Sequence, residues 1–222
     1  MLGYLLHNMK AIIIGATGAT GKDLVDLLLQ DTAFDKISVF VRRPLEVSDP
    51  MIETHIVDFK QIDAWKSRIQ GDVLFSCLGT TLKAAGSQEA QWKVDYDYQF
   101  DFAKAASENG VETLVLMSSK GADPNSSMFY MKMKGKLEEA VKLLAFKNTI
   151  IVRPPSLIRK NSDRWGEKLG VSALKLVNKI GLMRSMAPMS TEAVAKAMLT
   201  CGLHMKGQQV VESRELRKLA GV

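Results

Sequence analysis

A tyrosine and a lysine four residues apart form the first pair in this sequence that suits acid/base chemistry. Tyr130 and Lys134 lie near residues 128–145, where the pattern is that of an amphipathic helix, so their side chains share one helix face. A nearby ammonium favours the phenolate form of a tyrosine, which prepares it to give or take a proton. The alternative interpretation is a tyrosine packed at a sheet edge beside a lysine with a solvated head group.

Two serines precede this pair at the end of a short buried run. The run near 112–118 is typical of a β-strand and ends at Ser118 and Ser119. Ligands of open α/β sheets bind at the carboxyl ends of the strands, so a hydroxyl here is placed to hold a carbonyl or alcohol oxygen beside Tyr130. Adjacent serines on a strand point to opposite faces, and we expect Ser119 to face the substrate, with Ser118 as the alternative.

A glycine-rich loop near the N-terminus predicts a nucleotide-binding turn. A short apolar strand near 10–15 leads directly into Gly15, Gly18 and Gly21, and an amphipathic helix follows near 20–30. Glycines at this spacing let the backbone turn sharply and approach a pyrophosphate, and the helix N-terminus offers free N–H groups to the phosphates. A tight strand-to-helix turn without a ligand is the alternative.

Two arginines follow the second predicted strand, near 37–41. Folds that select NAD(H) place an acid here to bind the 2′-hydroxyl of the ribose, whereas this chain has Arg42 and Arg43. Guanidinium groups suit a 2′-phosphate, so we predict NADP(H) as the cofactor, the alternative being a pair of solvated arginines. After the third predicted strand, near 53–57, Asp58 either caps the next helix or accepts a hydrogen bond from the adenine amine.

The elements that position these residues alternate along the chain. Short β-branched runs separated by amphipathic segments predict an α/β fold, a doubly wound, mainly parallel Rossmann-type sheet with helices on both faces. Strands are expected near 10–15, 37–41, 53–57, 72–76, 112–118, 148–152 and 208–212, and helices near 20–30, 60–70, 88–109, 128–145, 167–180 and 190–203. The length fits a single domain, 1–222. Within it we expect a flexible extension at 1–8, a fold that starts near Met9, and a small C-terminal lobe on the substrate side at about 155–207.

Composition narrows the class of protein. Hydrophobic residues make up 46% and charged residues 24% of the chain, as in ordinary globular proteins. The net charge is +6, but the basic residues are spread out without interleaved aromatics, so we expect no nucleic-acid partner.

Cys77 and Cys201 form no zinc motif, which predicts no metal and a reduced, cytoplasmic protein. No apolar run approaches about 18 residues, so no membrane partner is expected. The expected partner is a small-molecule substrate, and the protein is expected to be a monomer or homodimer.

In order, the glycine loop, the arginine pair, the serine pair and Tyr-x-x-x-Lys resemble the short-chain dehydrogenase/reductase superfamily, in its atypical branch. More closely, stretches 77–87, 94–98, 118–123 and 129–135 are similar to the Tat-interactive-protein-like group of NAD(P)-binding proteins. The match covers roughly residues 10–160.

This resemblance implies roles for individual residues. Tyr130 would be the general acid/base, and Lys134 would both tune it and hold the nicotinamide ribose. The other residues that the resemblance implies for cofactor binding are Thr17, Gly18, Ala19, Thr20, Arg42, Arg43, Leu78 and Gly79. Extended members of the superfamily often carry asparagine where this chain has Asp95. The leading hypothesis is an NADPH-dependent oxidoreductase that reduces a carbonyl, and the alternative is a non-catalytic NADP(H)-sensing protein that uses the same cleft.

Overall fold

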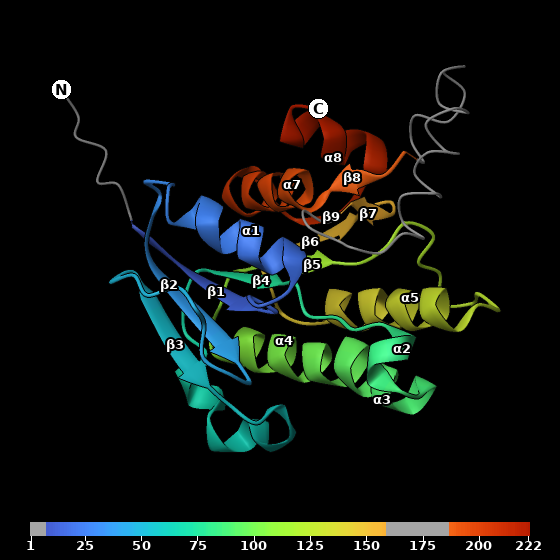
Figure 1. The fold of residues 1–222 in the computed structure, drawn as a ribbon, viewed down its shortest axis with the longest axis horizontal. Helices are drawn as coiled ribbons and strands as arrows, with labels where there is room; N and C mark the ends of the chain where they lie inside the picture. The colour runs from blue at the N-terminus through green and yellow to red at the C-terminus, as the bar shows by residue number, and fades with distance from the viewer. Residues whose placement is uncertain (1–7, 159–186) are drawn as a thin grey trace.

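A computed structural model describes residues 8–158 and 187–222, and its centre is a seven-stranded parallel sheet between two layers of helices (Figure 1). The strands are β1 (Met9–Ile14), β2 (Phe34–Val41), β3 (Ile52–Ile56), β4 (Val73–Ser76), β5 (Thr113–Met117), β6 (Asn148–Arg153) and β9 (Gln208–Glu212). Their order is β3-β2-β1-β4-β5-β6-β9, and every neighbouring pair is parallel. The predicted fold class and all seven predicted strands are confirmed.

The central strands are apolar on both faces because both faces are covered. In β1, Ala11 and Ile13 join the core on one side of the sheet, and Ile12 and Ile14 join the core on the other side. Such continuous apolar runs are what a parallel sheet buried on both sides requires.

The helices divide between the two faces of the sheet, as Figure 1 shows. On one side lie α1 (Ala19–Leu28), α7 (Thr191–His204) and α8 (Ser213–Ala220). On the other lie α4 (Tyr98–Glu108) and α5 (Phe129–Lys142), with the short helices α2 (Leu82–Ala85) and α3 (Gln88–Trp92) near one end of this layer. The predicted helices at 20–30, 88–109, 128–145 and 190–203 are therefore present, the second of them with a π-helical turn, η3 (Lys93–Asp97), between α3 and α4.

The helix predicted at 60–70 is wrong in type. Two short 3₁₀ helices, η1 (Phe59–Ala64) and η2 (Lys66–Arg68), take its place. The reason is local, since Gln61 has φ −121° and ψ 44°, which no regular helix accommodates. The helix predicted at 167–180 lies outside the described residues.

The described C-terminal part of the lobe predicted at about 155–207 contains helix α7. Helix α7 belongs to the main layer, where it packs against α1 and the sheet. Gly202 permits this close packing, because a Cβ there would lie 2.7 Å from Cζ of buried Phe75. Strands β7 (Leu157–Ile158) and β8 (Met189–Ser190) pair in parallel with each other. Residues 159–186, like residues 1–7 of the expected N-terminal extension, lie outside the described part of the chain.

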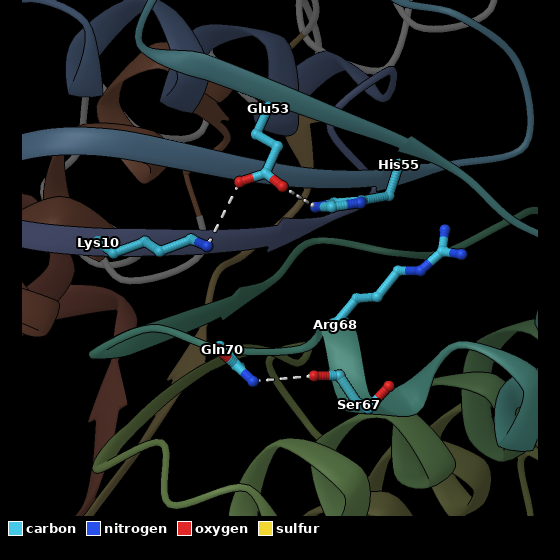
Figure 2. A pocket seen from close by; sticks show the side chains of 6 residues that line it. All are labelled: Lys10, Glu53, His55, Ser67, Arg68 and Gln70. Atoms are coloured by element: carbon cyan, nitrogen blue, oxygen red, sulfur yellow. Dashed lines mark hydrogen bonds and ion pairs between the residues drawn. The ribbon is translucent and has the colours of Figure 1, made fainter.

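A polar pocket of about 400 Å³ opens beside the starts of β1 and β3 and is drawn in Figure 2. Glu53 forms its centre, with Oε2 3.5 Å from Nζ of Lys10 and 3.0 Å from Nζ of Lys36. Nε2 of His55 lies 3.3 Å from Oε1 of Glu53 and 3.0 Å from Oγ of buried Ser38. The remaining lining residues are Ser67, Arg68 and Gln70. These polar groups largely bind one another, so we interpret the pocket as a structural polar cluster.

The His55 ring predicts a pH dependence of stability. Burial lowers the pKa of His55 below its ordinary value of 6.5, against the opposing effect of Glu53. A group whose pKa is lower in the folded state stabilises the fold fully above the unfolded pKa, and this contribution is lost as the pH falls. We expect the free energy of unfolding to decrease below about pH 6.5, by at most about 1.4 kcal/mol per pH unit from this residue. Urea unfolding from pH 5 to 8 should show a shallower decrease for His55→Gln. The exposed His204→Gln is the matched control and should follow the wild-type curve.

Candidate functional site

The candidate nucleotide site lies at the carboxyl ends of the adjacent strands β1 and β4. The segments that follow these two strands run to opposite faces of the sheet. After β1 the chain enters α1 on one face, and after β4 it leads to α4 on the other, so a crevice is expected at this carboxyl edge. Gly15, at the end of β1, has φ +83°, and a Cβ there would lie 2.5 Å from the backbone of Cys77 and Leu78. The glycine loop therefore lies directly against the segment that follows β4.

The three glycines of the loop have different surroundings. A Cβ on Gly21 would lie 2.1 Å from the carbonyl oxygen of Gly15, so this glycine is needed for packing. A Cβ on Gly18 would meet only that same oxygen, at 3.2 Å, and Gly18 is exposed. Gly18 is also the N-cap of α1, with no side-chain cap and no acid in the first turn. Free N–H groups beside an open glycine are the surroundings that a pyrophosphate requires.

The other loop residues lie around this helix end. Thr17 is exposed, Ala19 is half-buried and Thr20 is buried. The backbone around Gly18 is thus the accessible part of the loop, and the residues present fit a bound dinucleotide.

The arginine pair follows β2 at the same edge of the sheet. Arg42 and Arg43 are both exposed, and within the described residues neither guanidinium has an acidic partner. Burial raises the pKa of Tyr98, Asp58 adds to this rise and Arg42 opposes it, which places all three side chains in one neighbourhood. Oδ1 of Asp58 accepts a hydrogen bond from the Lys60 N–H at 3.0 Å, so Asp58 caps η1. Its contact with adenine stays a prediction.

The proposed acid/base pair lies on helix α5, with Tyr130 toward the solvent and Lys134 in the interior. Tyr130 lies in its first turn with 37% of its surface exposed, and Lys134, one turn later, is 3% exposed. Gly135 lets the helix pack closely, because a Cβ there would lie 2.2 Å from the backbone nitrogen of Pro124. The loop that follows β5 therefore determines how near α5 lies to the sheet edge.

Sequence reasoning missed the direct partner of Lys134. Nζ of Lys134 lies 3.6 Å from Oδ1 of Asp95, which is 1% exposed. Burial raises the pKa of Asp95, while Lys134 and the Thr80 N–H, which donates to Oδ2 at 2.8 Å, lower it. The available signal was Asp95 itself, which departs from the asparagine expected at this position from the resemblance to the short-chain dehydrogenase/reductase superfamily. Leu78 and Gly79 lie just before Thr80, in the same loop after β4.

The two serines have different partners. Ser118 is buried, and its hydroxyl donates to Oε1 of Glu138 at 2.5 Å. Ser119 is half-buried, and within residues 8–158 and 187–222 its hydroxyl makes only a long contact of 3.4 Å with the Lys120 carbonyl. Ser119 therefore has the freer hydroxyl, and its contact with a substrate stays a prediction.

Glu138 and Arg153 form a second ion pair on α5 that the sequence did not reveal. Nε and Nη2 of Arg153 donate to the two carboxylate oxygens of Glu138 at 3.0 and 2.5 Å, and Nη1 lies 3.0 Å from Oε1 of Glu212. Glu138 is four residues after Lys134, so one face of α5 carries the tyrosine, the lysine and this carboxylate. The pair ties α5 to β6 and, through Glu212, to β9.

Comparison with known proteins identifies the class to which this site belongs. Residues 15–202 match the family described as NAD(P)H-binding. The chain belongs to this family. A relative named "Protein FMP52, mitochondrial" from Meyerozyma guilliermondii is 36% identical and covers 96% of this chain and 95% of its own length. The protein of the same name from Saccharomyces cerevisiae is 39% identical over 71% of each chain.

Solved structures share the fold at low sequence identity. A UDP-glucose 4-epimerase from Thermotoga maritima, solved with UDP-glucose, has a TM-score of 0.68 and 13% identity, covering 96% of this chain and 83% of its own. The Bordetella bronchiseptica enzyme WbmF, solved in complex with NAD⁺, has a TM-score of 0.68 and 14% identity, covering 97% and 79%. This chain therefore shares the fold of these two proteins.

The relatives correct the predicted location. The sequence predicted a cytoplasmic protein, but the relatives that match most of the chain are named as mitochondrial, so that prediction is contradicted. The two unpaired cysteines indicate only a reduced environment and do not discriminate between these compartments. Among the described residues, no helix has the length and apolar character to cross a membrane.

Gly18 provides a test of the cofactor loop that is separate from folding. We expect Gly18→Ala to fold, because its Cβ has a single close neighbour, and to bind NADPH at least tenfold more weakly, because the methyl group occupies phosphate space. Loss of the glycine N-cap should cost about 1 kcal/mol or less. Calorimetric titration measures the affinity, and thermal unfolding measures the stability. Gly21→Ala is the contrasting variant and should fail chiefly in stability. Unchanged affinity in folded Gly18→Ala would show that no phosphate lies at this helix end.

Proposed function

We propose that this protein is an NADPH-dependent oxidoreductase of the short-chain dehydrogenase/reductase type that reduces the carbonyl group of a small molecule. The observation that carries the proposal is the placement of Tyr130 and Lys134 on one face of α5, at the sheet edge that also carries the open glycine loop. The stretches quoted for the Tat-interactive-protein-like group support placing the chain in that group of the atypical branch. We also propose a mitochondrial location, which the names of its relatives support.

The proposed mechanism divides the work between the described residues. The glycine loop and Lys134 would hold the cofactor, which when bound would supply the hydride for the carbonyl carbon. The Tyr130 hydroxyl donates a proton to the oxygen of that carbonyl as negative charge develops on it. The Ser119 hydroxyl orients the same oxygen, since the Ser118 hydroxyl is bound to Glu138. Lys134 contributes a fixed positive charge beside the tyrosine and holds the nicotinamide ribose.

The preference for NADP(H) rests on the arginine pair. Arg42 and Arg43 offer two exposed guanidinium groups after β2, where an NAD-selective site would offer an acid. Guanidinium groups bind phosphate oxygens in pairs, so a 2′-phosphate should find its partners here.

Calorimetric titration with NADPH and NADH tests this preference. We expect the wild type to bind NADPH at least tenfold more tightly, because two charge-assisted contacts are worth more than about 1.4 kcal/mol together. The double variant Arg42→Ala and Arg43→Ala should bind the two nucleotides with similar affinity. The double variant Lys206→Ala and Lys218→Ala removes two exposed charges as well, so it is the control for net charge and should retain the wild-type ratio. Equal wild-type affinities would overturn the assignment of NADP(H).

Tyr130→Phe tests for chemistry. The variant lacks one hydroxyl, so NADPH oxidation with a panel of aldehydes and ketones should slow by at least about 100-fold, as expected for loss of a general acid. NADPH affinity should stay within about twofold of the wild-type value. Tyr96→Phe is the matched control and should leave turnover unchanged, since Tyr96 stacks on Trp92 with ring centroids 4.9 Å apart. Full turnover by Tyr130→Phe would eliminate the proposed acid. A wild type that binds NADPH but reduces no member of the panel would favour the sensing protein.

A further inference from the structure

One arginine in the polar pocket of Figure 2 has no acidic partner in the described part of the chain. Arg68 lines this pocket, but no carboxylate of the described residues lies within ion-pair distance of its guanidinium. The carboxylate of Glu53 is already paired with Lys10 and Lys36. The nearby carboxylate of Asp72 accepts the backbone N–H of Lys10 at 2.6 Å. The cations of this cluster therefore outnumber its carboxylates.

The Arg68 side chain points toward the ring of His55. In Figure 2 it extends from η2 to the side of the pocket where His55 lies, and Lys10 lies on the other side of Glu53. Nε2 of His55 is already in use, since it lies 3.0 Å from Oγ of Ser38 and 3.3 Å from Oε1 of Glu53. Nδ1 of His55 has no hydrogen-bond partner among the described residues. The guanidinium and Nδ1 are therefore the two groups of the pocket with free hydrogen-bonding capacity.

Both walls of the pocket are fixed to the same buried aromatic ring. The His55 ring, on β3, stacks on Phe40 of β2 with centroids 4.5 Å apart. Trp65, which directly precedes η2, stacks on Phe40 as well, with centroids 5.6 Å apart. Stacked rings of this kind hold each other in place. The sheet wall with His55 and the η2 wall with Arg68 are thus kept at a constant separation.

A phosphate group fits these two free groups better than a carboxylate does. A guanidinium donates two parallel hydrogen bonds to two oxygens of an oxyanion. A carboxylate then has no oxygen left, whereas a phosphate keeps another oxygen for a second donor. In the neutral ring of His55, the proton belongs on Nε2 because Glu53 accepts it there. Nδ1 becomes a donor when the ring takes up a second proton, so the ligand and that proton should bind together.

We propose that the pocket between β3 and η2 binds the phosphate group of a soluble small molecule, held by the Arg68 guanidinium and the protonated His55 ring. A volume of about 400 Å³ is in the range of small-molecule sites. The site is separate from the glycine loop, because Lys10 beside it lies at the start of β1 and the loop follows the end of that strand. It therefore goes beyond the proposed oxidoreductase activity.

The charges around His55 predict that binding depends on pH. Burial has the largest effect on the pKa of His55 and lowers it, and Glu53 opposes this effect. The positive charges of Lys10, Arg68 and Lys36 lower the pKa further. A bound anion offsets these charges and favours the protonated ring. By linkage, the affinity for the anion should therefore increase as the pH falls.

NMR signals of the His55 ring, assigned by comparison with His55→Gln, report binding at this pocket and not at the glycine loop. Sodium sulfate is the probe, because it has the tetrahedral oxygens of phosphate and keeps its charge from about pH 5 to 8. The sulfate concentration that shifts the His55 signals halfway should be at least about threefold lower at about pH 5.5 than at about pH 8. Sodium acetate at the same ionic strength should bind at least about threefold more weakly than sulfate.

Arg68→Ala should raise the half-shift concentration of sulfate at least about tenfold at both pH values, since it removes the paired donors. The variant should fold, because Arg68 is exposed. Arg214→Ala is the matched control, because it removes an exposed arginine from α8 on the opposite face of the sheet. It should leave the half-shift concentration within twofold of the wild-type value.

Lipid head groups also carry phosphate, so a second measurement separates the two sources. Wild type and Arg68→Ala are sedimented with vesicles of equal parts phosphatidylcholine and phosphatidic acid. A soluble ligand predicts the same bound fraction for both proteins. A bound fraction that falls in Arg68→Ala would identify a lipid head group and overturn the assignment to a soluble molecule.

The sulfate titrations have three distinct results. A loss of affinity in Arg68→Ala but not in Arg214→Ala, together with tighter binding at low pH, supports the site. Equal losses in both variants, or His55 signals that do not respond to sulfate, overturn it. Arg68-dependent binding with the same affinity at both pH values overturns the role of protonated His55.

Discussion

The close contact between the backbones of Gly15 and Cys77 determines the geometry of the whole carboxyl edge. Strands β1 and β4 pair in register, with Ile14 opposite Ser76, so the loops that follow them begin side by side. A side chain at Gly15 would collide with the backbone of the neighbouring loop, so only glycine fits at this turn. The chain then leaves toward opposite faces of the sheet, and the crevice between the two paths is a consequence of that divergence.

The same edge contains charges that a core normally avoids. Helix α5 carries a buried ammonium at Lys134 and a buried carboxylate at Glu138, and each is paired with a group from another element. Pairs of this kind add little net stability, since desolvation offsets much of the attraction, but breaking one leaves an uncompensated charge and costs several kcal/mol. Asp95 and Arg153 therefore hold α5 in one position relative to η3 and β6. Because Tyr130 lies on the same helix, one turn before Lys134, the position of α5 also determines the position of Tyr130.

The sequence correctly predicted the features whose signals come from residues adjacent along the chain. The glycine loop and the seven strands have local signals, because a parallel strand buried on both faces is a continuous apolar run between turns. The helix predicted at 60–70 failed because the apolar pattern did not reveal the non-helical backbone of Gln61. The partners of Lys134 and Glu138 were missed because they come from segments far away along the chain. Only the folded sheet edge brings Asp95 and Arg153 to α5.

One turn of α5 passes from water to the interior, and the proposed reaction needs both environments. Tyr130 is 37% exposed, so its hydroxyl can recover a donated proton from solvent, whereas Lys134 is 3% exposed and pairs with Asp95. If the two were equally exposed, solvent would screen the attraction between the Lys134 ammonium and Asp95. If both were buried, the tyrosine would have no source of protons between turnovers. The packing of Gly135 on the loop at Pro124 places the helix between these two extremes.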